Sequence, residues 1–331
     1  MQPTHEWRDV APAGFQDIRK AGEPAVMRGL TADWPMVRAA RAGQGAKYLK
    51  DLAGEGPVPF MRAPAQVEGR LHYAEGAAGR NFRQQTGTLA EFLDQLETEA
   101  GKSRPDALAL QGLPAPERLA AFAEQNPMPV LPPAIIPRLW IGNAAKVAIH
   151  HDPSENIACV AAGRRRFTLF PPEAVGDLYM GPFHETPAGV QVSMVHLTDP
   201  DLDRFPRFAR AMEVAQTAEL EPGDAIYIPY QWYHHVESLE PFNVLVNYWW
   251  DAASAGAGSP WDAMMHGMMS LRTLPPDQRR AWKAMFDHYV FQTNGDPGAH
   301  LPEQSRGVLS PPTAQSIAQM RRMLLDRLGR G

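Results

Sequence analysis

The stretch HHDPSENIACVAAGRRRFTLFPP, at residues 150–172, decides the fold class. It contains two runs of apolar, β-branched and aromatic residues, NIACV and RFTLF, which are separated by a glycine that favours a turn. Further runs of this kind occur between residues 137 and 250, namely RLWIGN, KVAIHHD, AIYIP and NVLVNYWW. Short strands separated by turns predict an antiparallel barrel or sandwich.

Helical patterns flank this strand-rich region on both sides. Before it, Thr88–Thr98 repeats apolar residues at three- and four-residue spacing, which predicts a helix capped by Thr88. After it, a linker of small residues is followed by predicted amphipathic helices at about 276–289 and 313–328. We predict a mainly β fold with flanking helices in three parts: an α/β part at 1–136, a barrel at 137–250 and a helical extension at 251–331.

The composition excludes several classes of protein. Of the 331 residues, 44% are hydrophobic and 21% are charged, as in an ordinary globular protein. The formal net charge is −5, so no basic surface is predicted to attract nucleic acid. The N-terminus lacks a signal-peptide pattern and no run of 18 apolar residues occurs, which predicts a cytoplasmic protein that does not span a membrane. The single cysteine, Cys159, excludes an intrachain disulfide and a zinc–thiolate cluster, so a metal must be held by histidine and carboxylate.

Two separated segments supply such ligands. His150 and Asp152 are two residues apart, and a strand directs residues at this spacing to the same face. The pair alone is a weak signal, because a histidine bonded to an acid on a barrel strand gives the same pattern. His234 or His235 follows the strand AIYIP, and its spacing from Pro229 favours His234. Two imidazoles and one carboxylate predict a non-haem Fe(II) site, although a zinc hydrolase or isomerase can use similar ligands.

These segments resemble a known family. Residues 150–172, 223–238 (GDAIYIPYQWYHHVES) and 243–250 (NVLVNYWW) are similar in order and spacing to the JmjC-type cupin oxygenases, most of all the branch that contains factor inhibiting HIF, an asparaginyl hydroxylase. The resemblance implies a double-stranded β-helix core of the cupin or jelly-roll type. It also implies an Fe(II)- and 2-oxoglutarate-dependent dioxygenase that hydroxylates a protein side chain or a small molecule.

The resemblance also assigns roles to particular residues. The family's metal ligands fall on His150, Asp152 and His234. Arg165 falls where a basic residue, usually lysine, pairs with the distal carboxylate of 2-oxoglutarate, although it could also belong to the solvated run Arg164–Arg166. The other positions implied at the cosubstrate pocket or its mouth are Asn156, Asn247, Trp249, Tyr233 and the segment Pro182–Val195.

Two positions depart from the family pattern. Val147 stands where a threonine or serine is usual, and Ala109 or a neighbour in LALQG stands where a tyrosine is usual. The pocket is therefore predicted to be less polar than in the family. This leaves a second hypothesis, a non-catalytic cupin-like sensor or accessory protein that binds a metal or a ligand.

Expected partners follow from the same reasoning. A small molecule or a peptide is predicted as substrate, and neither nucleic acid nor a membrane is predicted as a partner. C-terminal helices of this kind form homodimers in the family that the chain resembles. We therefore predict a homodimer through the helices at about 275–330.

Overall fold

Two β-sheets form the centre of residues 1–251. The computed structural model describes residues 1–74, 79–184, 186–187, 189–251 and 258–329. One sheet has six strands in the order β1 (Gln2–Pro3), β12 (Gln216–Leu220), β11 (Arg165–Phe170), β14 (Tyr233–Ser238), β9 (Lys146–His150) and β5 (Arg70–Leu71). The other has nine, in the order β2 (His5–Arg8), β3 (Ala25–Arg28), β13 (Ala225–Ile228), β10 (Glu155–Ala162), β15 (Asn243–Trp250), β8 (Pro137–Gly142), β7 (Ala107–Pro114), β4 (Pro57–Ala63) and β6 (Arg83–Thr88).

The inner faces of the two sheets pack against each other. Phe167 of β11 and Val236 of β14, in the six-stranded sheet, share one apolar cluster with Ala158 of β10 and Leu245 of β15, in the nine-stranded sheet. Alternation along each strand brings these side chains to the same side, so the sheets enclose a common interior. The predicted β core is therefore present, and its interior is the place where inward-pointing polar residues can meet.

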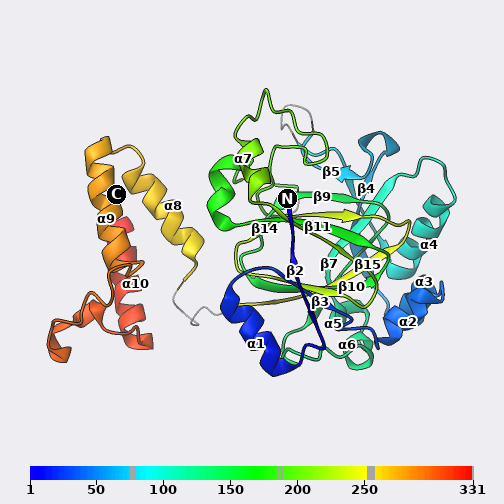
Figure 1. Cartoon of the computed structure of the whole chain (residues 1–331), viewed down its shortest axis with the longest axis horizontal. Coiled ribbons are helices and arrows are strands. Elements are labelled where there is room, and N and C mark those ends of the chain that lie inside the picture. Colours follow the sequence, from blue (N-terminus) through cyan, green and yellow to red (C-terminus); the bar gives the residue numbers. More distant parts are fainter. Residues whose placement is uncertain (75–78, 185, 188, 252–257, 330–331) are drawn as a thin grey trace. The chain divides into compact units, whose positions relative to one another are not determined.

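Helices cover the outer face of the nine-stranded sheet (Figure 1). Their apolar residues, including Phe15, Met36, Leu49 and Phe92, pack in one cluster with residues of β7, β8, β10 and β15. The helices within residues 1–251 are α1 (Pro12–Ala21), α2 (Pro35–Arg41), α3 (Gly45–Leu52), α4 (Leu89–Ala100), α5 (Ala115–Arg118), α6 (Phe122–Gln125) and α7 (Phe208–Glu213), with 3-10 turns at Ala65–Val67 and Pro172–Asp177. With this much helix the fold is mixed α/β rather than mainly β.

Thr88 caps α4 as predicted. Its hydroxyl accepts a hydrogen bond from the Glu91 backbone N–H at 3.2 Å, and the Glu91 carboxylate accepts one from the Thr88 N–H at 2.7 Å. We expect Thr88→Ala to lower the free energy of unfolding by about 1 kcal/mol, because a backbone N–H of the first turn loses its partner. Chemical denaturation of the whole chain measures this, with Thr86→Ala on exposed β6 as the control. Equal midpoints for the two variants would contradict the assignment.

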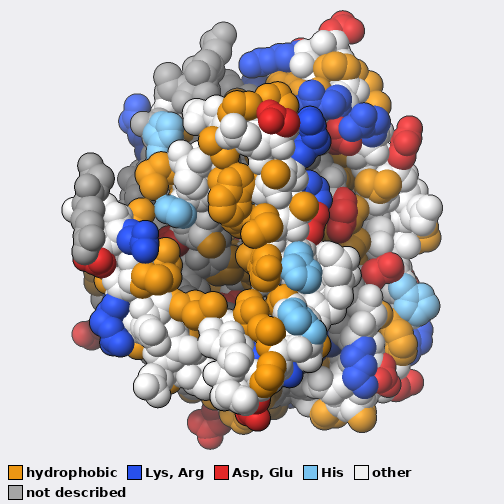
Figure 2. All heavy atoms as spheres, turned by 90° about the vertical axis from the view of Figure 1, so that its left-hand side faces the viewer, with side chains coloured by type: hydrophobic (Ala, Val, Ile, Leu, Met, Phe, Trp, Pro, Cys, Tyr) orange, Lys and Arg blue, Asp and Glu red, His pale blue; other side chains and the backbone are white. Residues whose placement is uncertain are grey.

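The chain divides by its contacts into Met1–Asp251 and Ala252–Gly331. The second unit contains α8 (Pro260–Leu271), α9 (Pro276–Tyr289) and α10 (Ala314–Leu328), with 3-10 turns at Glu303–Ser305 and Gly307–Leu309. None of the described residues of these three helices is buried. Hydrophobic side chains gather in a band on the surface drawn in Figure 2. Over the described parts of the chain, no helix has both the length and the apolar character that crossing a bilayer requires.

Candidate metal centre

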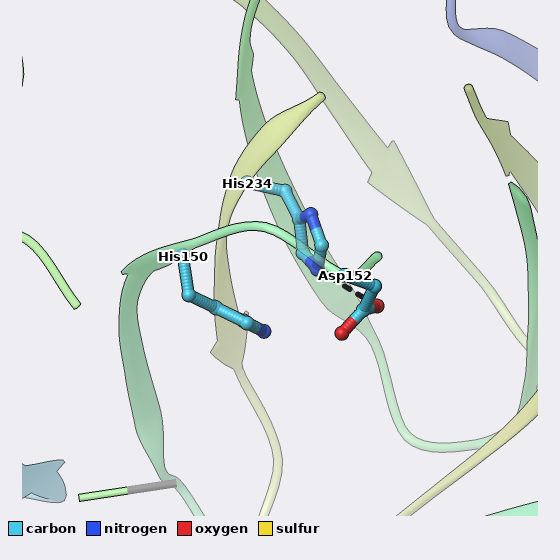
Figure 3. A group of neighbouring side chains, drawn as sticks. All are labelled: His150, Asp152 and His234. Carbon is cyan, nitrogen blue, oxygen red and sulfur yellow. Dashed lines mark ion pairs between the residues drawn. The ribbon is translucent and has the colours of Figure 1, made fainter. Parts of the chain in front are cut away.

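His150, Asp152 and His234 meet at one end of the six-stranded sheet. His150 is the last residue of β9, and it pairs across the ladder with His234 of β14. Asp152 lies in the connection to β10 rather than on the strand, because β9 ends before Pro153, which has no N–H for the ladder. The side chains point toward a common centre (Figure 3), and their candidate ligand atoms all lie within 4.8 Å of one another. The predicted ligands are thus brought together.

Hydrogen bonds prepare both imidazoles to bind a metal through Nε2. The His150 Nδ1–H donates to the Ala148 carbonyl at 2.8 Å, and the His234 Nδ1–H donates to the Trp232 carbonyl at 3.1 Å. These bonds fix the tautomer that leaves the Nε2 lone pair free. Burial, followed by the neighbouring His150, lowers the pKa of His234 to about 4, so this ring is neutral at physiological pH.

The carboxylate is also oriented by neighbours. Asn156 of β10 donates from Nδ2 to Asp152 Oδ2 at 3.2 Å, and Asn247 of β15 donates to Asn156 Oδ1 at 2.9 Å. All three side chains are buried. The His234 Nε2 atom lies 3.7 Å from Asp152 Oδ2, a gap that a shared metal ion could bridge. Two imidazoles and one oriented carboxylate fit a divalent ion such as Fe(II), with coordination positions left for other ligands.

A cavity of about 320 Å³ adjoins the three ligands. Its walls come from both sheets and are mostly apolar, with Phe167, Leu245 and Trp249 among them. The ring of Trp249 stands edge-on to that of Trp140, with centroids 5.1 Å apart. Such walls exclude water from a reacting centre, and the volume suits a small ligand.

Arg165 carries the one cationic side chain among the described residues that line this cavity. The residue is 5% exposed, its Nε has no partner, and its Nη2 makes only a long contact of 3.5 Å with the Trp140 carbonyl. Burial lowers the pKa of Arg165 to about 9, so the guanidinium stays charged at neutral pH. A buried cation without a counter-ion is costly, and it fits a site that receives the carboxylate of a ligand.

Comparison with known proteins places the chain in a family. A family model described as the cupin-like domain matches residues 11–256. The chain belongs to the cupin-like domain family. The match covers the metal-ligand cluster and every strand of the two sheets except β1 and β2, so the family resemblance predicted from the motifs is confirmed at this level. The particular branch that contains factor inhibiting HIF stays a prediction.

Several curated relatives of this cupin-like protein are named as lysine-specific demethylases or as HSPB1-associated protein 1. The chain is 37% identical over 114 residues to lysine-specific demethylase JMJ31 of Arabidopsis thaliana, covering 34% of the chain and 20% of that relative. It is 34% identical over 150 residues to human HSPB1-associated protein 1, covering 44% and 30%. It is 28% identical over 244 residues to lysine-specific demethylase 8 of Danio rerio, covering 71% and 54%. These matches span from about a fifth to about half of the relatives' own length.

The cupin-like cavity does not include every residue that the motifs suggested. Tyr233 precedes His234 on β14 and therefore points to the other side, where its ring lies 5.0 Å from that of His151. It packs in an apolar cluster with Ile149 and Phe170, away from the cavity, in contrast to the prediction. Of the proposed mouth segment Pro182–Val195, residues 189 and 190 line the cavity, whereas residues 185 and 188 lie outside the described residues.

The two positions that depart from the family pattern lie in different places. Val147 lines the cavity, as the family resemblance implied, but Ala109 packs elsewhere with Ala63 and Leu71. The neighbour that reaches the cavity is Gln111, which lies where β7 shifts register against β8. A polar residue inside the apolar run LALQGLP was the available signal.

Proposed function

We propose that the protein is an Fe(II)- and 2-oxoglutarate-dependent oxygenase of the hydroxylase type. The observation that carries this proposal is a single cavity that holds two imidazoles with free Nε2 atoms, an oriented carboxylate and an unpartnered buried guanidinium. Membership of the cupin-like domain family supports it, as do relatives whose names describe demethylases.

Each part of the cavity has a role in this proposal. His150, Asp152 and His234 hold the metal, and Asn156 with Asn247 keeps the carboxylate in place. When bound, Fe(II) would supply the chemistry that couples oxidation of 2-oxoglutarate to succinate and CO2 with insertion of one oxygen atom of O2 into a substrate C–H bond. Arg165 binds the distal carboxylate of the cosubstrate, while Trp140, Trp249 and Leu245 keep water away.

The proposal has a direct spectroscopic test. We expect the purified chain, loaded anaerobically with Fe(II), to develop a visible absorption band on addition of 2-oxoglutarate, because chelation of the metal creates a charge-transfer transition. We also expect succinate to form when O2 is admitted, even without a substrate. Absence of any 2-oxoglutarate-dependent change in absorption would contradict the proposal.

A second function is favoured by one observation. Val147 and other apolar side chains dominate the cavity walls, so the cosubstrate would have few polar contacts besides Arg165 and Gln111. A cupin-like sensor or accessory protein that binds a metal or a small anion without turnover agrees with this lining. Binding of 2-oxoglutarate with no succinate formed under O2 would favour the sensor. If the purified protein retains zinc and shows hydrolytic or isomerase activity, a zinc-dependent hydrolase or isomerase would be favoured instead.

We propose a small molecule or a peptide as the substrate. The net charge of −5 gives no general attraction for nucleic acid. The demethylase activities that the relatives' names state apply to those proteins. Assay of 2-oxoglutarate turnover against peptide and metabolite panels tests the substrate class.

We propose that α8–α10 mediate a homodimer. These helices expose large apolar side chains that a monomer in water would leave solvated. The exposed residues are Trp261, Met264, Met265, Met269, Trp282, Met285, Tyr289, Met323, Leu324, Leu325 and Leu328. In a two-fold symmetric dimer both copies contribute the same surface, so the apolar side chains of each copy would cover those of the other.

Light scattering tests this dimer. The chain mass is 36.6 kDa, so we expect about twice that value at micromolar concentration. Replacing both Leu324 and Leu325 with glutamate is expected to return the mass to that of one chain, because charge at an apolar interface disfavours association. Arg322→Glu, on the same helix, is the control and should leave the mass unchanged. A monomer mass for the unaltered chain would contradict the proposal.

A further inference from the structure

A second group of basic side chains lies on the outer face of the six-stranded sheet. Arg70 of β5 and Lys146 of β9 are partners in a parallel ladder, so their side chains emerge on the same face. The next residue of β9, Val147, points the other way into the metal cavity. The group is therefore separate from the cavity that holds the metal ligands.

Gly69 makes this close pairing possible. Its φ is +78°, and a Cβ at this position would lie 2.1 Å from the Ala144 carbonyl oxygen, so only glycine fits. The Gly69 carbonyl accepts a hydrogen bond from the Lys146 N–H at 2.8 Å. The backbone thus fixes the two cations beside each other.

Neither cation makes an ion pair within 4.0 Å among the described residues, and the Glu237 carboxylate, which lies across the β14–β9 ladder from Lys146, pairs with Arg166 instead. Arg28 pairs with Glu6 and Asp224, and Arg166 pairs with Glu219 and Glu237. Arg70, by contrast, is half-buried, and burial alone lowers its pKa. Desolvating a cation without pairing it costs free energy, which a bound anion would offset.

Two imidazoles extend the same surface. Arg70, Lys146 and His196 line two adjoining crevices. The inner crevice also contains His235, and the outer crevice also contains Gln66 and Asn81. Burial, followed by the charges of Arg70 and Lys146, lowers the pKa of His196. His235 lines the inner crevice, is 6% exposed and has no hydrogen-bond partner on its ring among the described residues. These rings add hydrogen-bond donors, while the adjacent positive charges disfavour a metal cation.

The outer crevice has the size and the groups for a small anion. Its volume is about 280 Å³, just below the range of about 300–1,000 Å³ for sites of drug-sized ligands, and a phosphate group is smaller than such ligands. The amide side chains of Gln66 and Asn81 also line it. Its single described carboxylate, Glu68, is exposed and makes no ion pair with Arg70 or Lys146.

We infer that Arg70, Lys146 and His196 form a second site that binds a phosphate group, either as free phosphate or as a small phosphate monoester. Arginine binds two oxygens of a tetrahedral oxyanion through its planar fork, and lysine adds a point charge beside it. Phosphate at this site also gives both cations a direct ion pair, which neither makes with a described carboxylate. The site lies on the opposite side of the sheet from the metal cavity and binds its anion without the metal.

Titration calorimetry of the full chain with inorganic phosphate tests the inference. Ionic strength is held constant with chloride, and the chain is measured both with chelator and with metal bound. We expect saturable binding of the same affinity in both forms. Arg70→Gln and Lys146→Gln should each weaken it at least about tenfold, because each removes a charge-assisted hydrogen bond. His196→Gln, outside the strands, should weaken it less and guards against a folding defect in the strand variants.

Arg165→Met is the matched control, since the buried Arg165 guanidinium of the metal cavity also lacks an ion pair and could attract phosphate. Retained phosphate binding in Arg165→Met assigns the anion to the outer site, and loss of binding there would overturn the inference. Binding heats for chloride equal to those for phosphate would also overturn the inference. Unchanged affinity for phosphate in Arg70→Gln and Lys146→Gln would do the same. Tighter binding of glycerol 3-phosphate than of phosphate identifies a monoester as the ligand, and equal binding identifies the free ion.

Discussion

Replacing Asp152 with alanine is expected to lower the affinity for a divalent metal by more than about 100-fold. Loss of an outer-shell partner typically costs roughly 10–100-fold, and loss of a ligand costs more. Asp152 is also the single carboxylate among the three ligands, so its removal leaves two imidazoles and no negative charge to balance that of the ion. Any 2-oxoglutarate-dependent turnover should disappear with the metal.

The measurement is titration with Co(II), whose visible absorption reports its coordination. Asn156→Ala should give an intermediate loss, because it removes the hydrogen bond of 3.2 Å to Asp152 Oδ2 but no ligand. Asp17→Ala, at an exposed aspartate, is the control and should bind like the unaltered chain. Metal affinity in Asp152→Ala equal to that of the control would remove Asp152 from the site.

The second large effect is expected at Arg165, where binding and stability should move in opposite directions. Arg165→Met is expected to weaken 2-oxoglutarate binding by about 100-fold, since two charge-assisted hydrogen bonds to a carboxylate contribute about 3 kcal/mol together. The ligand-free variant should be at least as stable as the unaltered chain, because the guanidinium it loses is buried and lacks a counter-ion.

Two measurements separate these effects. The change in Fe(II) absorption on addition of 2-oxoglutarate gives the affinity, and thermal unfolding without ligand gives the stability. Arg164→Met is the control, because Arg164 is exposed and pairs with Glu240 at 2.8 Å. A lower melting temperature for Arg165→Met than for Arg164→Met would show that Arg165 stabilises the fold. Unchanged 2-oxoglutarate affinity would remove it from the binding site.

Local patterns in the sequence were sufficient for several features. The helix that begins after Thr88 depends on a capping box and on three- and four-residue spacing, both of which lie within one segment. The ligands His150, Asp152 and His234 lie in two short motifs, although Asp152 reaches the site from the connection after β9 and not from the strand that the spacing predicted. These features were predictable because neighbours in sequence determine them.

Register decided what the motifs left open. His234 faces the cavity and Tyr233 does not, because β14 pairs with β9 so that His234 lies opposite His150. A shift of one residue would have exchanged the two faces. Similarly, the irregularity between Leu110 and Leu113 in the β7–β8 ladder determines that Gln111 reaches the cavity while Ala109 does not.

The sequence by itself determined the metal ligands, the strand-rich centre and the helices at both ends, because these depend on residue type and short-range periodicity. Only the tertiary structure decided which residues surround the metal and which cations lack partners. Trp140, Gln111 and Arg165 come from separate strands, and Arg70 meets Lys146 only because β5 adds to the edge of the sheet beside β9. Such neighbours are set by long-range strand pairing, which no local pattern encodes.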